Sequence, residues 1–90
     1  MSMDDTYFQM QNFERTLRSF NEHLKSSMRE LQDQHENVSP HWQDEMRKHY
    51  DSVWSPFQET MKHYIVSEAP NYVEFLNIKL YALRRYLQGG

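Results

Sequence analysis

The chain has 90 residues, of which 13 are acidic, 10 are basic and none is cysteine. A formal net charge of -3 argues against a general nucleic-acid binder, because such proteins need a clustered basic face. The absence of cysteine excludes disulfides, thiolate catalysis and cysteine-based zinc sites. Because 14% of the residues are aromatic, we expect a folded chain rather than a disordered one, forming one domain over residues 1–90.

The first predicted helix covers about residues 4–36, and Asp4, Asp5 and Thr6 are candidates to cap its start. Apolar residues recur along it at steps of three and four, which predicts a narrow seam packed against a second helix at a shallow angle. Ser27 and Gln34 lie in register with this seam and are predicted to set its packing register. The apolar members of the seam are Met10, Phe13, Leu17, Phe20, Leu24, Met28, Leu31 and Val38.

A short connector at residues 36–40 separates this helix from a second one at about residues 40–68. Ser39 is predicted to be the N-cap and Pro40 the first helical residue, and so short a connector requires antiparallel helices. The second helix carries an aromatic-rich stripe that repeats every eleven residues, and Pro56 within it predicts a kink. The stripe consists of Trp42, Met46, Tyr50, Val53, Trp54, Phe57, Met61 and Tyr64.

A third helical segment is predicted at about residues 70–88, after the boundary at Ala69-Pro70. Its apolar seam is formed by Val73, Leu76, Leu80, Leu83 and Leu87. The segment either extends the second helix or folds back as a third helix. We expect the extension. The combined second helix would then be longer than the first helix of roughly 30 residues, and the apolar seam beyond the end of the first helix would be free to contact a second subunit. The predicted fold is therefore all-α: an antiparallel hairpin with a kinked long second helix that forms a dimeric four-helix bundle, with a three-helix bundle as the alternative.

The sequence contains little that predicts chemistry. Glycine occurs only at residues 89 and 90, which excludes a glycine-rich phosphate loop. His41, Glu45 and His49 are spaced to share one helix face, so a metal-binding or enzymatic helical bundle is the alternative function. We expect no enzymatic activity and no cofactor, and we predict a protein–protein interaction module. Its expected contact residues are Trp42, Tyr50, Trp54, Phe57, Leu76, Leu80 and Leu83.

Over about residues 5–68 the chain resembles the WXG family of small type VII secretion substrates. Trp42-Gln43-Asp44 stands where that family has its Trp-x-Gly turn, with Asp44 in place of the glycine. Tyr64 and Glu68 match the family's Tyr-x-x-x-Asp/Glu export signal. The chain departs from the family at Pro56 and in its helical segment after residue 70. The resemblance implies a hairpin that pairs as a homodimer, or as a heterodimer with a similar small helical protein.

The same resemblance implies a cytoplasmic protein that a dedicated secretion system can export without a cleavable signal peptide. The first residues, Met-Ser-Met-Asp-Asp, are acidic and contain no apolar signal region. No run of about 18 apolar residues is present, so membrane insertion is not expected.

Overall fold

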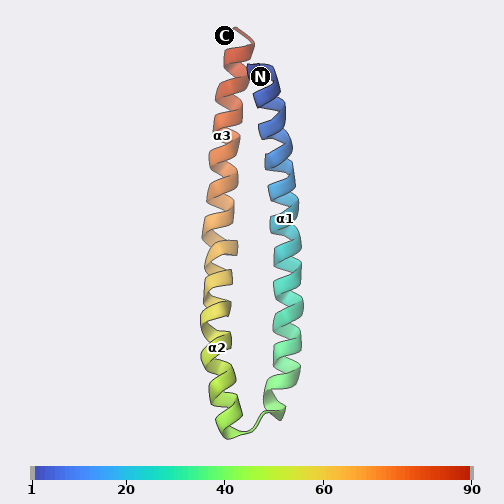
Figure 1. Ribbon diagram of the computed structural model, residues 1–90, viewed down its shortest axis with the longest axis vertical. Coiled ribbons are helices and arrows are strands. Elements are labelled where there is room, and N and C mark those ends of the chain that lie inside the picture. Colours follow the sequence, from blue (N-terminus) through green and yellow to red (C-terminus); the bar gives the residue numbers. More distant parts are fainter. Residues whose placement is uncertain (1, 90) are drawn as a thin grey trace.

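A computed structural model describes residues 2–89 as two long helical arms that lie side by side (Figure 1). The first arm is α1 (Met3–Val38). The second arm consists of α2 (Asp44–His63), a π-helical turn (Tyr64–Glu68) and α3 (Ala69–Leu87). The described residues contain no strand, and the molecule measures 66 × 20 × 16 Å. The predicted antiparallel helical hairpin is confirmed.

The start of α1 is capped by Ser2, not by the residues predicted for this role. The Ser2 hydroxyl accepts a hydrogen bond from the Asp5 backbone N–H at 3.2 Å. Asp4 and Asp5 lie in the first turn, where their negative charge complements the positive end of the helix dipole. Because the cap lies earlier than expected, α1 is 36 residues long and reaches further along the second arm.

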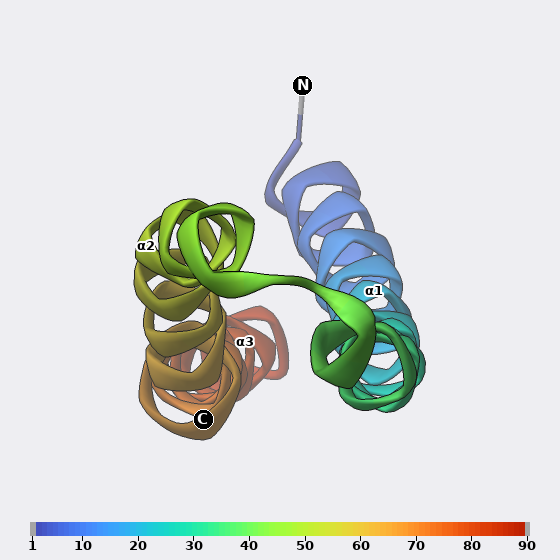
Figure 2. The same cartoon turned by 90° about the horizontal axis from the view of Figure 1, so that it is seen from below.

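The connector lies later in the chain than predicted and contains Trp42 (Figure 2). Ser39 continues the helical backbone into a short 3-10 turn, Ser39–His41. Pro40 lies in the first positions of this turn, where a backbone N–H would have no partner within the helix, so the missing N–H of proline costs no hydrogen bond. Trp42 has an extended backbone, and its N–H donates to the Ser39 carbonyl at 3.2 Å. The second helix therefore begins at Asp44, so the predictions of a start at Pro40 and a cap at Ser39 were wrong.

The second arm is nearly continuous, and α2 continues through Pro56 without a break in the helix. Its irregular part is the π-helical turn at Tyr64–Glu68, where the Ala69 N–H bonds to the Tyr64 carbonyl five residues earlier. Pro70 follows directly, and its ring lacks an N–H and crowds the carbonyl of the preceding turn. A widened turn accommodates that crowding without ending the helix. The segment after Pro70 thus extends the arm, and the alternative of a third helix folded back is contradicted.

The buried apolar side chains lie in α3. Ala69, Leu76 and Leu80 are 4%, 7% and 9% exposed, and Leu83 is half-buried. The expectation that this seam lacks a partner within the chain was wrong. The N-terminal half of α1 covers it, because α1 begins at Met3 and runs alongside α3 (Figure 1).

The apolar ladder of α1 faces the second arm along only one of its two lines. Leu17 and Leu24 are half-buried against that arm, whereas Phe13 and Phe20 are 49% and 55% exposed. Ser27 and Gln34, which continue the line of the two phenylalanines, are also exposed. The inner positions fall one residue later, at Glu14, Asn21, Met28 and His35.

Candidate interaction surfaces

An aromatic cluster joins the two arms near the hairpin tip. The His35 ring of α1 stacks on Trp54 of α2 with 4.5 Å between centroids, and on Tyr50 with 5.3 Å. Trp42 from the connector lies 4.5 Å from Tyr50, and Phe57 lies 5.6 Å from Trp54. Because Trp42, Tyr50, Trp54 and His35 are all half-buried, their rings contribute to holding the arms together at this end.

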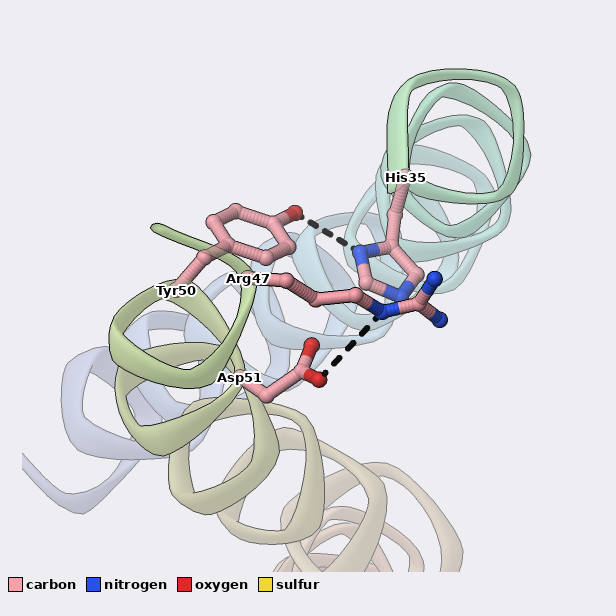
Figure 3. A network of polar contacts seen from close by, with 4 residues as sticks. All are labelled: His35, Arg47, Tyr50 and Asp51. Atoms are coloured by element: carbon pink, nitrogen blue, oxygen red, sulfur yellow. Dashed lines mark hydrogen bonds and ion pairs between the residues drawn. The ribbon is translucent and has the colours of Figure 1, made fainter. Parts of the chain in front are cut away.

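The cluster also contains a polar contact between the arms. His35 Nδ1 and the Tyr50 hydroxyl lie 2.7 Å apart and share a hydrogen bond (Figure 3). Beside this pair, Arg47 and Asp51 form an ion pair within α2 at 3.7 Å. The Trp54 indole N–H is buried and has no acceptor within the described residues. The predicted contact residues Trp42, Tyr50 and Trp54 are therefore engaged within the hairpin.

Two further hydrogen bonds cross between the arms. The Tyr64 hydroxyl donates to Asn21 Oδ1 at 2.9 Å, and Gln58 Nε2 donates to Gln32 Oε1 at 2.6 Å. Such directional contacts form in only one alignment, so they set the register of the hairpin. Ser27 and Gln34, predicted for this role, are exposed instead. The heptad of polar residues at Glu14, Asn21 and His35 is the signal in the sequence that could have identified the inner line and with it the Asn21 contact.

Glu14 is the charged member of this inner line and is 4% exposed. It lies on α1 along the part covered by α3, and Arg18, one turn later, forms an ion pair with its Oε1 atom. The Arg18 side chain is 59% exposed, so the pair connects a buried carboxylate to the surface. Burial of the Glu14 carboxylate is costly in desolvation free energy, so this pair is weak evidence for stability.

One broad side of the hairpin carries exposed apolar side chains from all three helices, and we call it the apolar face. The Phe13 ring meets Tyr72 of α3 edge to face, with 6.3 Å between centroids. Phe20 borders a shallow groove with Thr60 and Met61 of α2, and the charged or polar side chains of Glu59, His63 and Glu68 line the same groove. The face consists of side chains that are at least 41% exposed: Phe13, Phe20, Leu31, Val38, Met46, Val53, Phe57, Tyr72, Phe75 and Tyr86.

Helical spacing places the remaining members on the same side. Met46 and Val53 precede Thr60 by 14 and 7 residues, which returns them to nearly the same direction. Tyr86 follows Tyr72 by 14 residues for the same reason. Lys79 lies on the line of Tyr72, and its ammonium group sits 5.4 Å from the Phe75 ring centroid. The face therefore has members near both ends of the hairpin, and the polar and charged side chains beside Phe20 interrupt it in the middle.

The two flanks of α1 differ sharply in charge. The flank on the apolar face carries no charged residue at the positions Thr6, Phe13, Phe20, Ser27 and Gln34. The opposite flank carries most of the charge at Asp4, Arg15, Arg18, Glu22, Lys25, Arg29 and Glu36. The side of α1 that packs within the chain is the inner line, which lies between the two flanks. The difference between the flanks is therefore a difference between the two outer faces of the hairpin.

The residues of the predicted export signal lie in the π-helical turn. Tyr64 is half-buried, and its hydroxyl donates a hydrogen bond to Asn21. The Glu68 side chain is 59% exposed and lies 3.3 Å from the His63 ring nitrogen Nε2. Asp44 is exposed at the first residue of α2. Tyr64 and Glu68 thus belong to a continuous arm that α3 extends further.

The residues of the alternative metal site do not come together as predicted. His41 lies in the 3-10 turn before the connector, so it does not share a helix face with Glu45 and His49. Glu45 instead pairs with Lys48 at 3.7 Å. Among residues 2–89, no three histidine or acidic side chains are grouped so that they could hold a metal ion.

Comparisons of the chain with protein families, with curated proteins and with solved structures find no match. The resemblance to the WXG family thus rests on the residues quoted above. Within residues 2–89, no helix combines the length and the apolar character needed to cross a membrane.

Proposed function

We propose that this chain is a non-enzymatic protein–protein interaction module, a helical hairpin that pairs with a second copy through its apolar face. The observation that supports this most directly is the contrast between the two flanks of α1. Phe13 and Phe20 are about half exposed on an uncharged flank, while the opposite flank is charged. Exposed apolar side chains that extend over several elements are typical of an interface.

The dimensions of the hairpin support the proposal. Its broad side, of which the apolar face is one part, measures 66 by 20 Å, which can accommodate a standard interface of about 800 Å² per partner. The core of a single hairpin is small, since its buried apolar side chains within residues 2–89 are Ala69, Leu76 and Leu80. Burying the apolar face of two hairpins against each other adds stability that one copy lacks.

The test is the mass of the protein in solution as its concentration is raised. Sedimentation equilibrium is expected to show twice the 11.1 kDa mass of one chain. Phe20→Glu places a charge in the middle of the face and is expected to give a monomer. Phe8→Glu is the matched control, because Phe8 is 57% exposed but lies on the charged flank.

Phe8→Glu should remain dimeric. A wild-type protein that stays monomeric at every concentration contradicts the proposal, and so does a Phe20→Glu variant that remains a dimer.

We further propose that the module is associated with type VII secretion, on the strength of the resemblance and of the exposed acid Glu68. In host cells that carry such a system, Glu68→Gln is expected to lower the secreted fraction without changing the helical circular dichroism signal. Glu74→Gln, which changes another exposed acid of the same arm, should be secreted normally. Equal secretion of both variants and the wild type would remove the export function and leave the interaction function intact.

A further inference from the structure

A groove runs between the arms on the side opposite the apolar face. Its wider part has a volume of about 810 Å³, within the range of small-molecule sites. Ile65, Ala69 and Val73, from the π-helical turn and α3, form the apolar wall, and Tyr81 extends it toward the chain ends. The narrower part, of about 350 Å³, continues toward the hairpin tip. Ile65 and Lys25 border both parts, so the groove is continuous.

The charge along this groove is uneven. In the wider part, Arg18 and Lys25 are balanced by acids, since they pair with Glu14 and Glu22, and Glu74 also lines this part. The narrower part is bordered by three cations, Lys25, Arg29 and Lys62, and by one acid, Asp33. The groove thus has a positive end beside an apolar body, although the chain as a whole has a net charge of -3.

The π-helical turn strengthens the case for this location. Its residues Tyr64 and Ile65 border the wider part of the groove, and Pro70 lies beside them. Single π-helical turns within α-helices occur frequently at functional sites, because they widen the helix and displace the side chains that follow. Here the widened turn presents Ile65 between the apolar body and the positive end.

From this arrangement we infer that the groove binds an elongated amphiphile with an anionic head, such as the anion of a medium-chain fatty acid. The apolar chain lies against Ile65, Ala69 and Val73, and the head group is held by Arg29 and Lys62. Charge complementarity selects an anion over a neutral or cationic head group. The groove lies on the charged flank, so binding does not depend on the pairing of two copies through the apolar face.

The experiment uses decanoate as the probe, below its micellar concentration, with the full-length protein labelled for amide NMR. Titration is expected to shift the amide signals of Ile65, Val73 and neighbouring residues in a saturable manner. Lys62→Gln is expected to raise the dissociation constant of decanoate about tenfold, as expected for loss of one charge-assisted contact. Lys48→Gln, which removes a charge from an exposed residue away from the groove, should leave that constant unchanged.

Decanol, with the same chain and no charge, is expected to bind more weakly and to be insensitive to Lys62→Gln. The inference is overturned if decanoate does not bind, if Lys62→Gln has no effect, or if the shifted signals belong to Phe20 and Tyr72 on the apolar face. Because sedimentation of Phe20→Glu tests pairing separately, failure of one proposal is distinguishable from failure of the other.

Discussion

Two lines of side chains run along α1 one residue apart, and they differ in chemistry and in surroundings. The inner line, with Glu14, Asn21 and His35, faces the second arm and is mostly polar. The outer line, with Phe13 and Phe20, is aromatic and about half exposed. In a helix packed only within its own chain, the opposite distribution is the usual one.

The comparison shows that the two lines of α1 have different roles: polar side chains of the inner line set the alignment of the arms, and the large apolar side chains lie on the outer line. Hydrogen bonds such as Tyr64 to Asn21 form in one alignment only, so the polar inner line specifies how the arms meet. The apolar side chains of the outer line stay exposed, and the proposed pairing of two copies would cover them. Substitutions on the two lines should therefore differ in their dependence on protein concentration.

The largest expected effect separates the inner cluster from the outer line. Trp54→Ala removes the stacking on His35 and the contact with Phe57, and is expected to lower the free energy of unfolding by about 3 kcal/mol. Phe20→Ala should cost less than about 1 kcal/mol in dilute solution and more at high concentration, where pairing covers it. Urea unfolding at two protein concentrations measures both. If both variants lose the same free energy of unfolding in dilute solution, the distinction between the inner cluster and the outer line is wrong.

The next effect has the opposite sign and concerns the buried carboxylate. Glu14→Leu is expected to raise the free energy of unfolding by about 1–2 kcal/mol, because a buried ion is replaced by an apolar group of similar size. Glu22→Leu is the control on a side chain that is 75% exposed, and it should change stability by less than about 0.5 kcal/mol. A destabilised Glu14→Leu variant would show that the carboxylate supports the packing of α1 against α3.

A smaller effect is expected for the hydrogen bond in the middle of the hairpin. Tyr64→Phe leaves Asn21 Oδ1 without its donor and should lower the free energy of unfolding by about 1 kcal/mol. The double variant Tyr64→Phe, Asn21→Leu is expected to recover most of that loss in urea unfolding. Tyr81→Phe, which changes a side chain that is 63% exposed, should have no effect. Additive losses in the double variant would count against coupling between Tyr64 and Asn21.

The smallest effect is expected for a polar contact that does not cross between the arms. The Arg47–Asp51 pair lies within α2, and both side chains are about half exposed. Arg47→Gln should therefore change the free energy of unfolding by less than about 0.5 kcal/mol at any ionic strength. A larger loss in thermal or urea unfolding would assign Arg47 a part in the contact between His35 and Tyr50 beside it.

Much of the secondary structure could be predicted because it depends on local signals. The steps of three and four residues, the absence of internal glycine and the acidic first turn all favour long helices. The boundaries were less accurate, since Ser2 rather than the following acids caps α1, and the second helix begins at Asp44 rather than Pro40. Boundaries depend on which neighbouring side chain forms the cap, and several candidates stood within a few residues of each other.

The candidate surfaces were predicted only in part. The aromatic residues at the tip were identified, but their contacts with His35 were not, because the polar heptad that contains His35 lies one residue away from the more prominent apolar ladder of Phe13 and Phe20. Leu76 and Leu80 were expected to face another subunit and are instead buried within the chain. The groove beside the π-helical turn depends on residues from both arms, such as Lys25 and Ile65, whose proximity no single segment reveals.

By itself the sequence determined an all-helical chain with one short connector near its middle, predicted at residues 36–40, and hence an antiparallel hairpin. Only the tertiary structure decided which line of α1 faces inward and that α1 covers α3. The physical reason is that the spacing of apolar residues defines a broad apolar side of one helix. How that helix is rotated about its own axis depends on which side chains of the second arm it can contact. Asn21 and His35 find their partners in Tyr64 and Tyr50, and Phe13 and Phe20 consequently remain at the surface.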